Sequence, residues 1–276
     1  MKKIILLSSS LLLLSLTLSA QTYSWNEIAV DGRNTGCVSP SVENYAGTIG
    51  RFEGGKFIAP SGKVYKKCSA TYKAARTVLN AQPTMAPVKK VIAASREGMQ
   101  VKYPESKLSN WFIDNIMAGV EKAAGKKVHF GVGNFGGIRC DMPKGEVILD
   151  DLLSMFPFKN QIVYEELYGR DIRALLETMA AQKRFQVIGG VKVRVKDSKL
   201  VGVMIDGEPL DDDKIYGVAT ISFLLHGGDG LQMAHNAMNL KSYDIDIIDI
   251  MLEEVNRAAA AGETLDYELD NRVVIE

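Results

Sequence analysis

The 276-residue sequence has few histidines. His129, His226 and His235 lie far apart, and no two stand at the His-x-His or His-x-x-x-His spacing typical of metal sites. A two-metal phosphoesterase centre gathers several His and Asp ligands around cations about 3.5–4 Å apart. We therefore expect no metal, no cofactor and no catalytic residue in this chain.

Other catalytic signatures are also missing from the sequence. It contains no Gly-x-Ser-x-Gly elbow, no Gly-rich phosphate loop ending in Lys-Ser/Thr and no dinucleotide fingerprint. The three cysteines are Cys37, Cys68 and Cys140. Cys140 beside Arg139 could act as a nucleophile, but a buried or bridged cysteine is the more common case in an exported protein. The odd number leaves the pairing open, with Cys37–Cys68 as our preference because both lie in the Gly/Ser-rich part.

Neither sign of charge is in excess, since 33 basic residues balance 33 acidic ones. A chain without net charge has no broad field to steer it onto nucleic acid or an anionic membrane. We therefore expect no nucleic-acid partner, and any anion must be bound locally.

The sequence contains one long apolar run, at residues 4–18. The run follows Lys2 and Lys3, and small residues, Ser19 and Ala20, come directly after Leu18. The run is shorter than the roughly 20 apolar residues that span a bilayer, and it has the form of an export signal. The sequence predicts a signal peptide at residues 1–20, export to the periplasm or the exterior, and no membrane span after cleavage.

The rest of the chain divides by composition into two parts. Residues 21–89 are rich in Gly, Ser, Thr and Asn, and turn signals such as Glu53-Gly54-Gly55 predict an extension of short strands and loops. Residues 90–276 alternate helical and strand patterns. We expect helices at about 105–124, 149–153, 169–181 and 245–261, and strands at about 128–132, 161–167, 191–195, 200–205, 215–220 and 267–274. Hairpins and crossover helices in one region predict an α/β (α+β) fold with mixed sheets.

Three turns contain combinations of aromatic, polar and glycine residues that core packing alone does not require: Asn134–Arg139, Phe156–Asn160 and Ser222–Gly230. Each alone is compatible with an ordinary turn or a core phenylalanine. Together they supply two flat rings to sandwich a base, a carboxylate for ribose hydroxyls, and an amide and an arginine to orient the rest.

These turns occur as part of a longer series of motifs in one order and approximate spacing: Asn134-Phe-Gly-Gly-Ile-Arg139, Phe156-Pro-Phe158-Lys-Asn160, Leu167-Tyr-Gly169, Gly189-Gly190, Gly207-Glu-Pro-Leu-Asp211, Lys214-Ile-Tyr216 and Phe223-Leu-Leu-His-Gly-Gly-Asp229-Gly230. In this the sequence resembles, over residues 90–276, the C-terminal domain of the 5′-nucleotidase family. The resemblance implies a four-layer α/β/β/α arrangement that clamps a nucleoside.

By motif position, the resemblance implies a role for each of six residues. Phe158 and Phe223 correspond to the rings that sandwich the base, and Asp229 to the carboxylate that holds the ribose. The resemblance also implies polar contacts: Asn134 and Arg139 correspond to the pair that reaches the base edge and the substrate phosphate or carboxylate, and Lys102 stands where relatives have an arginine. Lysine keeps the charge but loses the planar two-pronged contact.

Two departures from the family pattern matter. Phe135 replaces what is commonly a third glycine, and we expect it to narrow the loop. The family's N-terminal metallophosphatase domain, with its metal ligands, is not found in these residues. The resemblance therefore implies a nucleoside- or nucleotide-recognition domain that supplies substrate binding to a separate metallophosphatase chain. The alternative is an autonomous, non-catalytic nucleoside-binding module.

Overall fold

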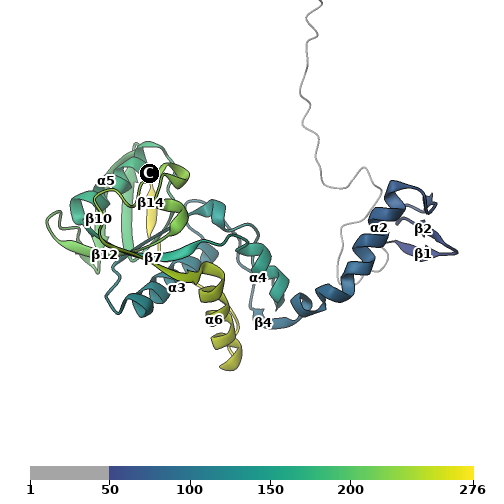
Figure 1. Cartoon of the computed structure of the whole chain (residues 1–276). Helices are drawn as coiled ribbons and strands as arrows, with labels where there is room; N and C mark the ends of the chain where they lie inside the picture. Colours follow the sequence, from purple (N-terminus) through teal and green to yellow (C-terminus); the bar gives the residue numbers. More distant parts are fainter. Residues whose placement is uncertain (1–49) are drawn as a thin grey trace, which may run out of the picture. The chain divides into compact units, whose positions relative to one another are not determined.

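The computed structural model describes residues 50–276. The expected signal peptide, Cys37 and most of the Gly/Ser-rich extension lie outside the described residues. Contacts divide the chain into two compact units, with the boundary between Asn80 and Ala81 (Figure 1). Within the described chain, no helix is both long and apolar enough to cross a bilayer.

The described part of the first unit contains three short antiparallel strands and one helix: β1 (Arg51–Glu53), β2 (Lys56–Ile58), β3 (Val64–Tyr65) and α2 (Ala70–Ala81). Strand pairing places Phe52, Phe57 and Tyr65 on one face of this sheet, and the Phe52 ring meets Tyr72 of α2 edge-on at 5.1 Å. These three short strands lie within the extension for which the sequence predicted short strands and turns. Helix α2 was not expected, although the Ser69 hydroxyl accepts the Tyr72 N–H as a helix cap.

The second unit begins with a 3-10 segment, η2 (Gln82–Lys89), and then mixes strands with helices. Its helices are α3 (Lys107–Ala124), α4 (Leu149–Met155), α5 (Gly169–Ala181) and α6 (Ile247–Ala260). Its strands are β4 (Val91–Ser95), β5 (Phe130–Gly133), β6 (Gly145–Ile148), β7 (Gln161–Tyr168), β8 (Val187–Gly189), β9 (Val191–Lys196), β10 (Lys199–Ile205), β11 (Glu208–Pro209), β12 (Ile215–Ile221), β13 (Met238–Asp246) and β14 (Val273–Ile275).

Two of the sheets in this unit are mixed, which confirms the expected fold class. The five-stranded sheet has the order β13-β7-β12-β5-β8 and contains one parallel pair, β12 with β5. The four-stranded sheet has the order β11-β10-β9-β14, and β14 runs parallel to β9. The predicted 191–205 hairpin is the antiparallel pair β9–β10.

Helix α3 forms where the apolar periodicity predicts it. Ser106 caps its first turn by accepting the N–H of Ser109, and Gly125 ends it in a left-handed conformation with φ of 62°. Its apolar residues are buried and cover one face of the five-stranded sheet, where Gly131 and Gly189 leave room for Met117.

Two elements differ from the sequence-based expectation. The long strand expected at 267–274 is only Val273–Ile275, and β13 was not expected at all. Most of β13 is exposed at the edge of its sheet, so it lacks the alternation of apolar and polar residues that marks a half-buried strand.

The register of the central strands brings the three informative turns to one edge of the sheet. Strands β5 and β12 are parallel neighbours, so their carboxyl ends, followed by Asn134 and Phe223, lie at the same edge. Strand β7 is antiparallel to β12, and Ile162 at its start pairs with Ile221 at the end of β12. The turn that carries Phe158 therefore precedes β7 at that same edge.

Candidate functional site

A pocket of about 220 Å³ opens where these three turns meet. It is lined by Asn134, Gly136, Phe158, Asn160, Phe223 and Asp229. Four of the six residues implied by the family resemblance are thus brought together, although they come from segments up to 95 residues apart in sequence. The structure does not test whether they bind a ligand, and that role stays a prediction.

The two phenylalanines of the pocket are unusually exposed for their type. Phe158 is 46% exposed and Phe223 is 44% exposed, whereas Phe112, Phe130 and Phe185 are almost completely buried. A pair of open aromatic rings in one concave site is more typical of a stacking surface than of a core.

The Gly-rich turn after Phe223 holds a carboxylate at the mouth of the pocket. A side chain on Gly228 would overlap the carbonyl oxygen and ring of Phe223, so only glycine lets the turn fold back onto that ring. Asp229 itself is left-handed, with φ of 51°, between Gly227 and Gly230, which also have positive φ.

Asp229 is held in place by two donors. The Asn134 amide donates from Nδ2 to Asp229 Oδ2 at 3.0 Å, and the Arg184 guanidinium donates from Nη2 to Asp229 Oδ1 at 3.1 Å. Each carboxylate oxygen has a second lone pair, so the group can still accept hydroxyl donors from a sugar.

The amide of Asn134 has one buried atom without a partner. A carboxylate only accepts hydrogen bonds, so the amide nitrogen must face Asp229 and the amide oxygen must point the other way. That Oδ1 atom is buried and has no hydrogen-bond partner among the described residues. A side chain on Gly137 would overlap this oxygen, so the second glycine of the Asn134–Arg139 turn leaves space for the acceptor.

Arg139 lies beside the pocket rather than in its lining. Its guanidinium is 5.8 Å from the centre of the Phe158 ring, and Nη1 donates to the carbonyl of Gly136 at 3.2 Å. The Arg139 cation therefore contacts Gly136 and Phe158, two residues that line the pocket, and it remains exposed to solvent.

The other two residues singled out by the family pattern lie outside the lining. Lys102 is exposed and forms no hydrogen bond or ion pair with any described residue. The Phe135 ring packs against the ring of Tyr103 at 5.9 Å and is not among the residues that line the pocket, so its effect on the loop stays a prediction.

Sequence reasoning missed three contributors to the site. Gly136 and Asn160 line the pocket and belong to motifs that were singled out, but neither was assigned a role. Arg184 follows a helix, is exposed and precedes Asp229 by 45 residues, so no local pattern connects the two.

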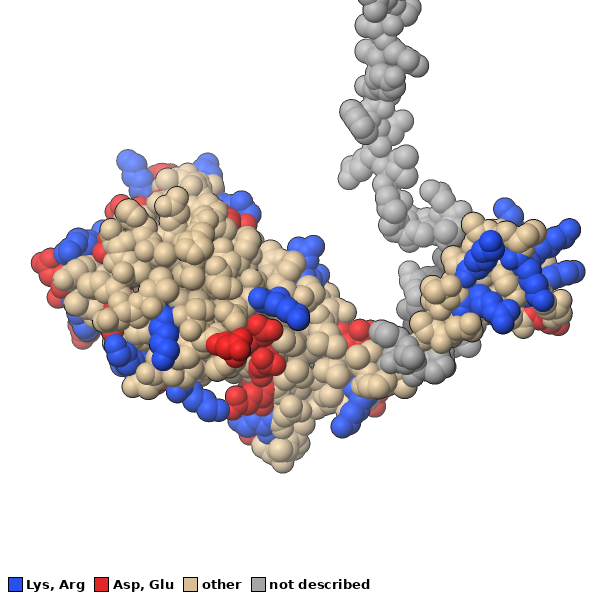
Figure 2. All heavy atoms as spheres, in the orientation of Figure 1, with Lys and Arg blue, Asp and Glu red and all other residues tan. Residues whose placement is uncertain are grey.

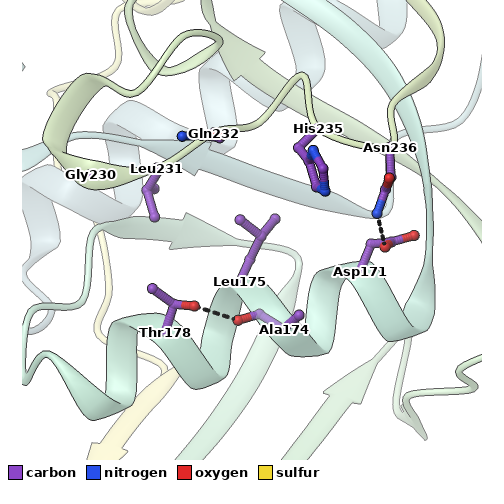
Figure 3. Close-up of a pocket in the computed structure, with 9 residues that line it drawn as sticks. All are labelled: Asp171, Ala174, Leu175, Thr178, Gly230, Leu231, Gln232, His235 and Asn236. Atoms are coloured by element: carbon purple, nitrogen blue, oxygen red, sulfur yellow. Dashed lines mark hydrogen bonds between the residues drawn. The ribbon is translucent and has the colours of Figure 1, made fainter.

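A larger depression, of about 360 Å³, lies next to the Asp229 turn between α5 and the segment Gly230–Asn236. Figure 3 shows Leu175 and His235 facing this space from its two sides, and Asn236 donates to Asp171 at 2.8 Å. No aromatic ring pair lines it, so it does not offer the sandwich geometry of the smaller pocket.

The histidines and cysteines of the described chain stand apart from the pocket. His129 accepts the N–H of Gly217 through Nδ1 at 3.0 Å, and burial together with the nearby Lys127 cation lowers its pKa. Burial and neighbouring carboxylates raise the pKa of the Cys140 thiol, which disfavours the reactive thiolate. Cys68 and Cys140 are free thiols, so the preferred Cys37–Cys68 bridge gains no support. Within residues 50–276, no group of three or more His, Cys, Asp or Glu side chains could hold a metal ion.

The comparison with known families identifies the class of domain that carries this pocket. The family model for the 5′-nucleotidase C-terminal domain matches residues 86–236, more than half of the chain. The chain therefore belongs to the 5′-nucleotidase C-terminal domain family.

Individual relatives agree with this assignment. The chain is 30% identical over 142 residues to the silent protein UshA(0) of Salmonella typhimurium, covering 49% of this chain and 26% of the relative. It is 30% identical over 159 residues to a 5′-nucleotidase of Vibrio cholerae, covering 53% of this chain and 28% of the relative. The matched region thus spans only about a quarter of these relatives' length.

Solved structures show the same fold. A 5′-nucleotidase precursor from Thermus thermophilus superimposes with a TM-score of 0.64 at 24% identity, covering 74% of this chain and 43% of that one. The NAD nucleotidase of Haemophilus influenzae superimposes with a TM-score of 0.55 at 14% identity, covering 80% and 48%.

Proposed function

We propose that this chain binds a nucleoside or nucleotide by placing the base between Phe158 and Phe223. The observation that carries the proposal is the convergence of two open rings, a braced carboxylate and an unpartnered buried amide oxygen in one pocket. Base stacking contributes about 1–3 kcal/mol per aromatic contact, so two rings supply about 2–6 kcal/mol of the roughly 8 kcal/mol that micromolar binding requires, and the polar groups must supply the rest.

The polar groups of the pocket would then orient the ligand. The lone acceptor Asn134 Oδ1 suits an N–H or amino donor on the edge of a base. Asp229 suits ribose hydroxyls, and the exposed cation of Arg139 suits a phosphate. Lys102 is a weaker candidate for the phosphate because nothing in the structure directs it toward the pocket.

Replacing either ring by alanine should weaken nucleoside binding by about 5- to 150-fold, because each substitution removes one stacking face. Titration calorimetry of Phe158→Ala and Phe223→Ala against a nucleoside measures the loss. The double variant should lose less than the sum of the two, since a base released on one side is free to shift. Leu240→Ala is the control, because it removes a similarly exposed apolar side chain, at 41%, outside the pocket. Unchanged affinity in both phenylalanine variants would show that the rings do not stack on the ligand.

We further propose that hydrolysis of the bound nucleotide depends on a metallophosphatase carried by a separate chain. The matched relatives are about four times longer than the matched region, and the active groups of a two-metal phosphoesterase are not brought together within residues 50–276. An autonomous nucleoside-binding module is the alternative.

The purified chain should release no phosphate from nucleoside monophosphates, even with added divalent metals. A phosphate-release assay across successive purification steps tests this, with a nucleoside titration on the same sample to establish that the pocket is intact. Phosphate release that stays with this chain through every purification step would contradict the proposal that a separate chain carries the metallophosphatase. Co-purification of a metallophosphatase from the native host would favour it over the autonomous alternative.

Export is the third part of the proposal, supported by the apolar run at residues 4–18 and its small-residue end. The intact mass of the protein from its native host should correspond to a chain that starts at Gln21. A cytoplasmic protein that retains Met1 would contradict export.

A further inference from the structure

The zero net charge of the chain conceals a separation of charge between its two units. Residues 50–80 contain seven basic residues and one acidic residue. The basic residues are Arg51, Lys56, Lys63, Lys66, Lys67, Lys73 and Arg76. Residues 81–276 contain 23 basic and 29 acidic residues. Residues 50–80, the described part of the first unit, therefore have a net charge of +6 and a local positive field, even though the whole chain has no broad one.

All seven cations of this unit are exposed, and most have no carboxylate nearby. The single acidic residue, Glu53, pairs with Arg51 at 3.2 Å. The other six form no ion pair with any described residue. Figure 2 shows Lys and Arg side chains gathered over the described atoms of this unit. Six unpaired cations within 31 residues repel one another, so an anionic surface would be bound favourably.

The cations come from β1, β2, α2 and the residues that flank β3, rather than from one segment. Lys56 belongs to β2, and the side chain of Lys67 lies over the β1–β2 turn, close to Gly55. Lys73 and Arg76 are three residues apart on α2, so they share one side of the helix. The folded unit therefore presents them at fixed positions.

The aromatic rings of the unit do not form a platform for nucleic-acid bases. Phe57 and Tyr72 are buried, and Phe52 packs against both at 5.2 and 5.1 Å. Single-stranded nucleic acid is bound by stacking successive bases on several open rings, whereas Phe52, which is 38% exposed, is the one exposed aromatic ring among residues 50–80. The cations are mainly lysines, which act as point charges without the planar fork that arginine offers to individual phosphates.

One apolar side chain among the cations favours a lipid surface over the backbone of a duplex. Val64 is 52% exposed and lies between Lys63 and the pair Lys66–Lys67 along the chain. An apolar side chain gains free energy by entering the interface of a bilayer, whereas a phosphodiester backbone offers it no apolar surroundings. Clusters of four to eight Lys and Arg residues are typical of surfaces that bind anionic lipids.

We propose that the basic unit formed by residues 50–80 docks onto the phosphate-bearing headgroups of an anionic membrane. This site is independent of the nucleoside pocket. It would retain the nucleotide-binding unit at a membrane surface by contacts that salt can reverse.

Vesicle co-sedimentation tests the proposal directly. The chain from Gln21 onward should be used, because it keeps every described residue and lacks the apolar run that would itself enter a bilayer. It should sediment with vesicles of mixed phosphatidylcholine and phosphatidylglycerol at low salt, and neither with pure phosphatidylcholine vesicles nor at high salt. Since each cation near an anionic surface contributes about fivefold, Lys66→Gln/Lys67→Gln should weaken binding by about 30-fold.

Matched variants separate a docking surface from a general effect of charge. Lys56→Gln/Lys73→Gln removes two cations from other elements and should produce a similar loss. Lys196→Gln/Lys199→Gln changes the net charge equally but alters exposed lysines of the β9–β10 hairpin in the second unit, and should leave vesicle binding unchanged. Unchanged nucleoside affinity in all three variants would establish that the second unit is intact.

Three results would overturn the proposal. The first is equal sedimentation with neutral and anionic vesicles. The second is an equal loss in all three double variants, which would mean that net charge alone governs binding. The third is tighter binding to duplex DNA than to vesicles at matched phosphate concentration, which would assign the surface to nucleic acid.

Discussion

Replacing Arg272 by alanine should lower the free energy of unfolding by up to about 3–5 kcal/mol, because the change removes a buried guanidinium and leaves the partly buried Asp114 carboxylate without its counter-ion. Arg272 is only 5% exposed. Its guanidinium donates two hydrogen bonds to the Asp114 carboxylate, at 2.8 and 2.9 Å, and two to the Asp270 carboxylate, at 2.9 and 3.3 Å. The Tyr267 hydroxyl donates to the same Asp114 carboxylate at 2.7 Å. Arg272 thus joins the segment before β14 to Asp114 of α3.

Urea unfolding of a small set of variants would isolate this interaction. Arg272→Lys should recover little stability, because an ammonium group cannot form the two-pronged contact. Arg272→Ala in an Asp114→Asn background should cost less than in the wild type, since the carboxylate is already gone. Arg257→Ala is the control: this guanidinium lies at the surface and its ion pairs with Glu254 and Glu263 are screened by solvent, so the loss should be much smaller than for Arg272→Ala. Equal losses from Arg272→Ala and Arg257→Ala would contradict the assignment.

Arg272 also shows why the end of the chain was predicted wrongly. The sequence around it combines polar residues with a short apolar run and reads as one long strand. In the structure only Val273–Ile275 pairs with β9, and the preceding residues form a loop held by hydrogen bonds to Arg272 and to Glu105 of a distant segment. Long-range polar contacts of this kind have no local sequence pattern.

Elements with strong apolar periodicity were predicted well, whereas exposed ones were not. Helices α3, α5 and α6 and the β9–β10 hairpin bury one clear face each, which fixes both their type and their approximate bounds. Strand β13 is mostly exposed and gave no such signal. Helix α2 could have been found from its capping residue Ser69, but the glycines and serines before it favoured turns.

The pocket was easier to predict than its surroundings because its residues stand in short motifs at the ends of strands. Parallel pairing of β5 with β12 brings Asn134 and Phe223 to one edge of the sheet, and the antiparallel β7 brings Phe158 there. Residues that act from further away could not be found in this way. The brace on Asp229 by Arg184 depends on the tertiary fold alone.

The uneven distribution of charge along the chain could not be seen from the overall composition either. Equal numbers of acidic and basic residues indicated no broad field, and for the whole chain that is correct. Along the chain, however, the described part of the first unit, residues 50–80, is strongly basic, whereas the second unit, residues 81–276, has more acidic than basic residues. Electrostatic arguments about partners therefore depend on knowing where one unit ends.

Glu165 should make the protein less stable as the pH rises from about 4.5 to 8, and Glu165→Gln should abolish that loss. The side chain is fully buried on β7, an inner strand of the five-stranded sheet, and neither carboxyl oxygen has a hydrogen-bond partner among the described residues. Burial raises the pKa of this carboxyl from 4.5 to about 8. Below pH 4.5 the group is protonated in both the folded and the unfolded chain. Above it the unfolded chain releases the proton while the folded chain retains it, so unfolding becomes more favourable.

The size of the effect follows from the same shift. Each pH unit between the two pKa values costs about 1.4 kcal/mol, so the wild type should lose about 3 kcal/mol by pH 7 relative to pH 4.5. His129 acts in the opposite direction, because its pKa is lowered and its contribution is lost as the pH falls through its titration. The difference between the variant and the wild type at each pH removes this contribution, since both proteins contain His129.

Chemical unfolding at a series of pH values should therefore give two curves that meet near pH 4.5 and separate steadily up to about pH 8, with Glu165→Gln the more stable. Glu165→Met, which removes the buried polar group altogether, should show the same gain at high pH and retain an advantage at low pH. Glu177→Gln removes an exposed carboxylate from α5 and serves as the control. If the curves of Glu165→Gln and the wild type ran parallel over the whole range, the carboxyl would have to be ionised in the folded protein. It would then need a cationic or hydrogen-bonding partner at β7, because an isolated charge at a fully buried position is too costly to persist.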